Sequence, residues 1–273
     1  MLKPHAEGPT RRAFAATISG ERGGVPAASA DLPESLWLVR HAESEGNLAD
    51  LRAHQARAER LELQARDADM PLSPTGERQA MALGRAWREL PANERPTVVL
   101  CSPYERALRT ADLAVAAAEL GLDLVRDERL RERDLGVLDG YTKHGIERHF
   151  PQEAQRRSWV GKFYYRPPGG ESWADVAGRV RAVVDAVERR YVGERLVLVT
   201  HQAVMMLARY VLENLSEAQI LDLDATEQIA NTGVVRYSYV DGAPVLESAN
   251  DTSHLDEVST PVTEEPDATA VSR

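Results

Sequence analysis

The sequence predicts an α/β protein with a mostly parallel central sheet and helices on both faces. Four short apolar runs typical of strands alternate with longer helical segments, at 36–39, 97–101, 122–125 and 196–200. Strands separated by helices form parallel sheets whose faces the helices cover. Later in the chain, an alternating run at 234–239 meets 244–246 through Asp241-Gly242, which indicates an antiparallel hairpin.

Several of the predicted helices have clear N-terminal signals. In SPYE at 102–105, serine is followed by proline and then, three residues after the serine, by glutamate, the pattern of a capping box. Ser172 opens a second helix, predicted to run to about Tyr191, and a third is predicted at 75–90. The segment 48–66 favours a helix but is highly charged, so we expect it on the surface near the site.

The two ends of the chain differ in composition from residues 34–249, which we expect to form one catalytic domain. Residues 1–33 are rich in Gly, Ala, Pro and charge, and we interpret them as a flexible leader. TRRAF at 10–14 weakly resembles a twin-arginine export signal, but the apolar stretch after it is short and interrupted by charge. Residues 250–273 are acidic and are expected to form a disordered tail.

Composition excludes some classes of protein. The 273 residues are 43% hydrophobic, which is enough to bury a core, and no apolar run approaches the roughly 20 residues that cross a bilayer. The net charge of -10 argues against a general nucleic-acid binder, which needs a basic face. The single cysteine, Cys101, rules out an internal disulfide and fits a reducing compartment. We therefore expect a cytoplasmic protein that binds neither nucleic acid nor membranes.

Chemically active side chains follow the ends of all four predicted strands. In an α/β sheet, ligands bind beyond the carboxyl ends of the strands. Taken singly, each of these side chains could be structural: a histidine after a buried strand is often a core residue, and an arginine on a helix can pair with a neighbouring acid. Their arrival at one edge from four strands favours a functional site formed by Arg40, His41, Asn47, Arg106, Glu132, His201 and Gln202.

Phosphoryl transfer is the chemistry that fits this set. The planar fork of arginine matches the oxygens of a phosphate, and a neutral imidazole can attack phosphorus to form a phosphohistidine. A carboxylic acid can protonate the leaving alkoxide. The sequence contains neither a P-loop pattern nor histidine-carboxylate spacing typical of a metal site. We therefore expect no cofactor and no metal, with arginines and a second histidine providing the electrostatic stabilisation.

Four segments resemble, in order, those of the histidine phosphatase superfamily, which includes cofactor-dependent phosphoglycerate mutase and fructose-2,6-bisphosphatase. They are LVRHAESEGN at 38–47, SPYERALRTA at 102–111, LRERDLG at 130–136 and VTHQAVM at 199–205, and LSPTG at 72–76 adds to the match. The resemblance implies a phosphoglycerate mutase-like fold. It also implies that His41 is the nucleophile and Glu132 the general acid. The phosphoryl group would be held by Arg40, Arg106 and His201, assisted by Asn47 and the backbone at Gln202.

The chain departs from the family signature at Ala42, where glycine is usual. We expect this change to be tolerated unless the backbone there needs a positive φ. One pair of segments bears on which branch of the family, and hence which substrate, the chain resembles. FYYR at 163–166, followed by GES at 170–172, favours the fructose-2,6-bisphosphatase branch. Met206 and Gly169, however, stand where that enzyme has a substrate-binding arginine and a lysine.

The mutase branch is also only partly matched. GYTK at 140–143 resembles its substrate-lysine segment, but its paired arginines are not found in register before Pro167-Pro168. We therefore expect a phosphatase acting on a small phosphorylated metabolite. Phosphoglycerate mutase activity is the nearest alternative, followed by fructose-2,6-bisphosphatase activity and by an inactive binder of phosphorylated ligands. The sequence leaves the natural substrate and the oligomeric state open.

Overall fold

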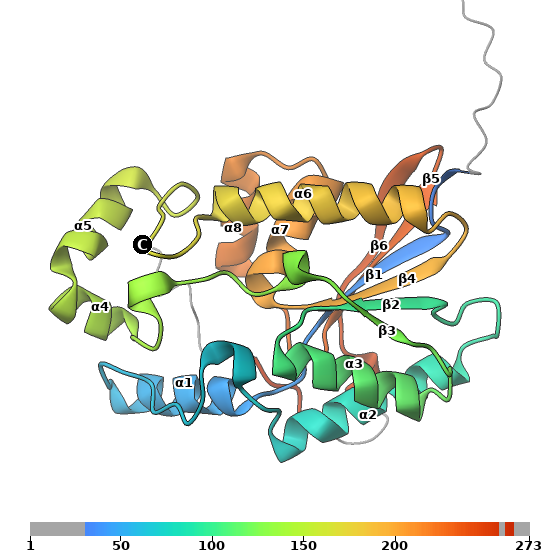
Figure 1. Ribbon diagram of the computed structural model, residues 1–273, viewed down its shortest axis with the longest axis horizontal. Helices are drawn as coiled ribbons and strands as arrows, with labels where there is room; N and C mark the ends of the chain where they lie inside the picture. The colour runs from blue at the N-terminus through green and yellow to red at the C-terminus, as the bar shows by residue number, and fades with distance from the viewer. Residues whose placement is uncertain (1–30, 257–259, 265–273) are drawn as a thin grey trace, which may run out of the picture.

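A computed structural model describes residues 31–256 and 260–264 (Figure 1). The strands form a single mixed sheet in the order β3-β2-β4-β1-β5-β6. The first four strands along the chain pair in parallel, while β5 pairs antiparallel with both β1 and β6. The bounds of the strands are β1 Ser35–Arg40, β2 Val98–Cys101, β3 Leu124–Arg126, β4 Arg195–Thr200, β5 Val234–Val240 and β6 Ala243–Asp251. The mostly parallel sheet predicted from the sequence is confirmed.

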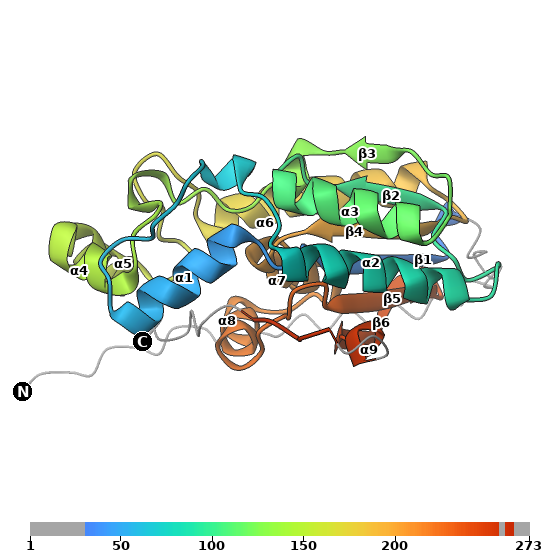
Figure 2. The same ribbon diagram turned by 90° about the horizontal axis from the view of Figure 1, so that it is seen from below.

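Helices cover both faces of this sheet, as predicted (Figures 1 and 2). Helices α6 and α7 lie on one face, α2 and α3 lie on the other, and α4 and α5 lie beyond one end of the strands. The bounds of the helices are α1 Glu45–Ala56, α2 Pro74–Glu89, α3 Glu105–Ala117, α4 Lys143–His149, α5 Pro151–Val160, α6 Trp173–Arg190, α7 Gln202–Leu212, α8 Glu217–Thr226 and α9 Ser253–Asp256. None of the helices in the described ranges is long and apolar enough to span a membrane.

The hydrophobic core is divided into two layers by the sheet. Side chains alternate along a strand between its two faces. Leu36 and Leu38 of β1 therefore join the core under α6 and α7, whereas Trp37 and Val39 pack with α2 and α3. Burial on both faces explains why the central strands appear in the sequence as continuous apolar runs.

The helix signals are confirmed at Ser172 and wrong at Ser102. Ser172 caps α6 in a reciprocal box with Asp175, as its position predicts. Helix α3 instead begins at Glu105, and its N-cap residue Tyr104 makes no side-chain capping bond. Ser102 lies fully buried directly after β2, and its hydroxyl accepts from the backbone N–H of Tyr104 at 3.2 Å and also hydrogen-bonds His201.

The charged segment at 48–66 is helical over only part of its length. Helix α1 begins at Glu45 and ends at Ala56, after which Arg57 adopts a left-handed conformation with a φ of 49°. The chain then passes through an irregular stretch to a short 3-10 turn at Asp67–Asp69. The hairpin between β5 and β6 forms as predicted, with Asp241 and Gly242 at φ values of 51° and 80°.

The predicted start of the disordered tail at residue 250 is too early. Strand β6 continues to Asp251, and His254 and Leu255 in α9 are buried. Residues 260–264 also pack on the domain through hydrogen bonds to α2 and to the loop before β5. The acidic composition gave no sign of these contacts, because backbone carbonyls and a threonine hydroxyl make them. Most of the predicted leader, residues 1–30 with the TRRAF segment, lies outside the described residues.

Candidate active site

The loop after β1, residues 41–44 (the β1 loop), carries the predicted nucleophile at the carboxyl edge of the sheet. Each of its first three backbone N–H groups is bonded by a different element. The N–H of His41 donates to Thr200 O at 2.8 Å, that of Ala42 to Thr110 Oγ1 at 3.0 Å, and that of Glu43 to Gln79 Oε1 at 2.9 Å. Ala42 is not among the described residues with a positive φ, which removes the need for glycine there.

The hydrogen bonds of the His41 ring define its tautomer. Nδ1 lies 2.8 Å from the carbonyl oxygen of Ala42, which can only accept, so Nδ1 carries the proton. Nε2 faces Arg106, whose Nε donates to it at 3.2 Å. Burial, followed by the positive charges of Arg106 and Arg40, lowers the pKa of His41 well below its ordinary value of 6.5. His41 is therefore a neutral imidazole whose Nε2 lone pair faces a guanidinium group.

Arg106 reaches the site from the first turn of α3 and is almost fully buried. Its Nη1 donates to the backbone oxygen of Asp67 at 2.6 Å and to the carboxylate of Asp67 at 3.0 Å. The ring of Tyr104 lies under the guanidinium, 5.2 Å from its central carbon. Arg106 is therefore held by an acidic side chain as well as by His41.

His201 approaches His41 from the end of β4, with the two ring centroids 5.1 Å apart. Its Nε2 lies 2.8 Å from Ser102 Oγ, and its buried Nδ1 has no hydrogen-bond partner among the described residues. Burial, and then the charge of Arg106, lowers the pKa of His201 well below 6.5. The Nδ1 atom is thus a buried polar group available to a ligand.

Arg40 completes the group at the end of β1. Its side chain is fully buried and donates from Nη1 to the carbonyl oxygen of Ile229 at 2.6 Å. Its charge helps to lower the pKa of both His41 and His201. The structure thus brings four of the predicted residues, Arg40, His41, Arg106 and His201, together at one edge of the sheet.

Glu132 lies on the loop that follows the 3-10 turn Glu128–Leu130. Its carboxylate accepts from the backbone N–H of Arg133 at 2.7 Å, and its backbone oxygen accepts from Arg179 at 3.3 Å. Glu132 is also one of the charges that act on Tyr104, whose pKa is raised to about 12 mainly by burial. The Tyr104 ring packs on Arg106 and His201, so Glu132 acts electrostatically on a residue that contacts this group.

The remaining two predicted residues have local contacts of other kinds. Asn47 Oδ1 accepts from both the backbone N–H and the hydroxyl of Ser44, so its side chain forms the capping box of α1. Gln202 is the first residue of α7, where a helix leaves backbone N–H groups unpaired, and such groups bind anions. The side-chain amide of Gln202 is buried with no hydrogen-bond partner among the described residues.

Sequence reasoning missed several residues that shape the site. Asp67 lies in a segment without hydrophobic period, so nothing predicted its contact with Arg106. Asn231 donates to the carbonyl oxygen of His41 at 3.0 Å, and no motif marks it. Ser102 follows the second predicted strand, but the sequence assigns it no contact with His201. The SPYER segment that contains it also contains Arg106, and this proximity was the available signal.

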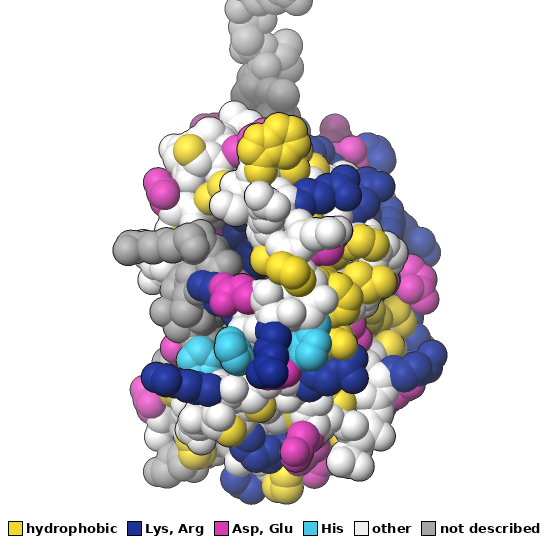
Figure 3. Space-filling model, turned by 90° about the vertical axis from the view of Figure 1, so that its left-hand side faces the viewer, with side chains coloured by type: hydrophobic (Ala, Val, Ile, Leu, Met, Phe, Trp, Pro, Cys, Tyr) yellow, Lys and Arg dark blue, Asp and Glu magenta, His cyan; other side chains and the backbone are white. Residues whose placement is uncertain are grey.

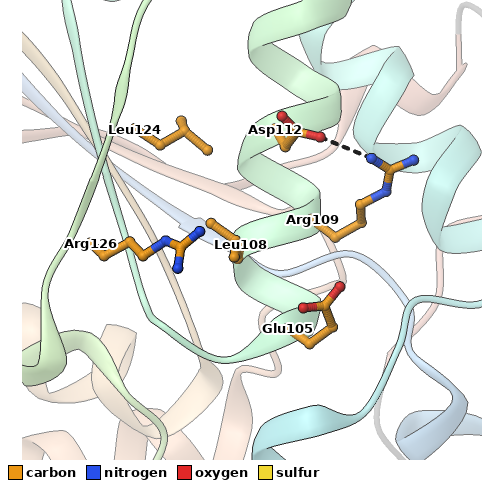
Figure 4. Close-up of a pocket in the computed structure, with 6 residues that line it drawn as sticks. All are labelled: Glu105, Leu108, Arg109, Asp112, Leu124 and Arg126. Carbon is orange, nitrogen blue, oxygen red and sulfur yellow. Dashed lines mark hydrogen bonds and ion pairs between the residues drawn. The ribbon is translucent and has the colours of Figure 1, made fainter.

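Two surface hollows formed by the described residues lie away from these side chains. A hollow of about 380 Å³ lies between α3 and β3, and its lining residues include an Arg109–Asp112 ion pair (Figure 4). A second, of about 500 Å³, lies between α1 and α4. The α4–α5 end of the molecule shows basic, acidic, histidine and apolar side chains interspersed (Figure 3). In the described ranges, no three His, Cys, Asp or Glu side chains are arranged to hold a metal ion.

The fold and this arrangement of residues identify the class of protein. The family model "Histidine phosphatase superfamily (branch 1)" matches residues 36–252, and the chain belongs to this family. The chain is 32% identical over 231 residues to the probable phosphoglycerate mutase GpmB of Salmonella paratyphi C, covering 81% of this chain and 94% of that protein.

Other relatives in this family have different names. The chain is 32% identical over 197 residues to a 6-phosphofructo-2-kinase/fructose-2,6-bisphosphatase of Caenorhabditis elegans, covering 70% of this chain but only 37% of that protein. Among solved structures, mycobacterial glucosyl-3-phosphoglycerate phosphatase is similar, with a TM-score of 0.61 and 25% identity over 80% of this chain and 99% of that one. YhfR of Bacillus stearothermophilus has a TM-score of 0.65 and also 25% identity, over 81% of this chain and 98% of its own.

Proposed function

We propose that the protein hydrolyses a phosphate monoester through a phosphohistidine on His41. The observation that carries the proposal is the state of the His41 ring. Nδ1 donates to the carbonyl of Ala42 and burial lowers the pKa, so Nε2 carries the lone pair, which here accepts from Arg106 and would turn to the phosphorus of a ligand bound by the surrounding cations. A neutral nitrogen in this position is suited to in-line attack on phosphorus.

In the first step, Nε2 of His41 attacks phosphorus, an N–P bond forms and the P–O bond to the leaving group breaks. Glu132, as general acid, gives its proton to the departing alkoxide oxygen. Arg40, Arg106 and His201 balance the charge on the phosphoryl oxygens, with Asn47 and the backbone N–H at Gln202 as further donors. In the second step, a water molecule attacks phosphorus and gives its proton to Glu132, and the N–P bond breaks to release inorganic phosphate and neutral His41.

Small phosphorylated metabolites are the proposed substrate class. Related structures include a phosphatase named for glucosyl-3-phosphoglycerate, which supports hydrolysis. The similarity to GpmB over nearly its whole length supports phosphoglycerate mutase activity as the second candidate. Hydrolysis is preferred because the substrate-binding arginine pair of the mutase was not found in register in this chain.

The proposal is tested with a panel of sugar phosphates, phosphoglycerates, nucleotides and phosphopeptides, with release of phosphate as the readout. His41→Ala is expected to lower kcat about a thousandfold or more, because it removes the nitrogen that forms the N–P bond. His144→Ala, which removes an exposed histidine on α4, is the matched control and keeps full activity. Turnover that survives in His41→Ala would disprove the mechanism.

Two further measurements separate the alternatives. The quenched enzyme should carry a phosphoryl group that is labile in acid and stable in base, the behaviour of a phosphohistidine. Adding 2,3-bisphosphoglycerate and following 3-phosphoglycerate separates a mutase from a hydrolase. Interconversion of the phosphoglycerates faster than release of phosphate would favour the mutase, and binding without either reaction would favour an inactive binder.

A further inference from the structure

The C-terminal segment at 260–264 passes beside two buried side chains that belong to distant parts of the chain. Gln79 of α2 donates from Nε2 to Pro261 O and to Thr263 Oγ1, both at 2.9 Å. The hydroxyl of Thr263 donates in turn to Asn231 Oδ1 at 3.0 Å. The backbone carbonyl of Thr263 accepts from the backbone N–H of Asn231 at 2.8 Å. Thr263 therefore connects α2 to the loop that precedes β5.

The same two side chains also bind the β1 loop. Gln79 Oε1 accepts from the backbone N–H of Glu43 at 2.9 Å, and Asn231 Nδ2 donates to the carbonyl oxygen of His41 at 3.0 Å. Both amide side chains are fully buried, whereas Thr263 is half-buried, so loss of the Thr263 hydroxyl would remove a partner from two buried polar groups. The β1 loop is thus held at its start and near its end by amides whose other ends meet at Thr263.

These contacts form one hydrogen-bond chain with a single direction. The Glu43 N–H donates to Gln79, Gln79 donates to Thr263, Thr263 donates to Asn231, and Asn231 donates to the carbonyl of His41. A side-chain amide can rotate by half a turn and exchange its oxygen and nitrogen. The Thr263 hydroxyl opposes that exchange in Asn231, because it offers a hydrogen to Oδ1.

We propose that Thr263 is a positioning residue that fixes the β1 loop and thereby aims Nε2 of His41 at the phosphoryl group. The inference rests on the proposed function, since it concerns the nucleophile of that reaction. A hydroxyl is required because only a group that both accepts and donates can join two amides in this order. Small displacements of a reacting group lower the rate strongly without preventing binding.

Thr263→Val tests the proposal, because it keeps the shape of the side chain and removes the hydroxyl. With p-nitrophenyl phosphate, kcat is expected to fall about tenfold. The Kd for inorganic phosphate, measured by calorimetry, should stay within about twofold, because Arg40, Arg106 and His201 are unchanged. Thr263→Ser restores the hydroxyl and should recover kcat. Val262→Ala, at an exposed neighbour, is the control expected to match the parent protein.

Melting curves and a second variant distinguish a loss of positioning from a general loss of stability. Melting curves are recorded for every variant, and kcat is compared well below the lowest midpoint. In a double-mutant cycle with Asn231→Ala, the loss of kcat in the double variant should be smaller than the product of the two single losses, because both variants break the same hydrogen-bond chain. An unchanged kcat in Thr263→Val, an equal loss in Val262→Ala, or fully additive losses would each overturn the inference. Turnover that persists in His41→Ala would instead overturn the proposed function.

Discussion

At the scale of single residues, the site depends on histidines that burial keeps neutral. The pKa of His41 is lowered by burial first and then by two arginines, and the carbonyl of Ala42 only partly opposes this effect. An exposed histidine would gain a proton near pH 6.5 and lose its nucleophilic lone pair. The buried imidazole keeps this lone pair as the pH falls below that value.

This state of His41 predicts the acid side of the pH–rate profile. After correction for the second ionisation of the phosphate ester, which lies near pH 6, kcat/KM should not decline with a pKa of about 6.5. Stopped assays between pH 7.5 and 5 with a constant ionic strength provide the measurement. A tenfold decline of the corrected kcat/KM per pH unit that starts at pH 6.5 would mean that His41 is exposed to solvent in the working enzyme.

At the scale of elements, the turn Asp67–Asp69 places an acid on Arg106, the arginine that we propose binds the phosphoryl group. The Asp67 carboxylate and a phosphate would compete for the same guanidinium fork. The proposed binding of a phosphoryl group to Arg106 would therefore displace Asp67, and with it the stretch between α1 and α2.

Asp67→Asn tests this competition. We expect inorganic phosphate to bind about three- to tenfold more tightly, because the amide carries no charge and the lost ion pair is only partly buried. Asp69→Asn, in the same turn, is the matched control, since Asp69 pairs with Arg66 on the surface. Calorimetric titration of both variants with inorganic phosphate measures the two Kd values. Weaker binding to Asp67→Asn would show that Asp67 orients Arg106 for phosphate instead of opposing it.

The sequence predicted the elements and site residues that depend on regular patterns. Arg40 and His201 end neighbouring parallel strands, so the topology alone brings them together. Asp67 and Thr263 were beyond reach, because they lie in segments with no period and act through contacts between distant parts of the chain. The start of α3 was predicted too early, because the local sequence fits a cap at Ser102, and the contact of Ser102 with His201 depends on burial directly after β2.

At the scale of the whole molecule, buried neutral histidines make the stability depend on pH. His254, which bonds Thr232, has its pKa lowered to about 4, mainly by burial. The unfolded chain takes up protons at its histidines near pH 6.5, whereas the folded chain does not. The contribution of His254 to stability is therefore full above pH 6.5 and declines as the pH falls from there toward about 4, and His41 and His201 act in the same direction.

Urea unfolding at several pH values between 7.5 and 4.5 measures this dependence. The free energy of unfolding should fall steadily below pH 6.5, and His254→Asn should reduce the slope, because asparagine takes up no proton. The comparison uses the slope of the free energy of unfolding against pH and not its absolute value, since the substitution also alters packing in α9. An identical slope in the variant would show that His254 is protonated in the folded state.

The burial of Cys101 determines how the molecule reacts with oxidants and alkylating reagents. It is the single cysteine of the chain, it has no exposed surface, and burial raises its pKa to about 11. Thiolates, not thiols, react with peroxide and iodoacetamide, so the native fold protects the Cys101 sulfur from both reagents. A cysteine introduced in place of the exposed Trp159 on α5 would therefore accept a fluorescent label selectively, with Cys101 left in place.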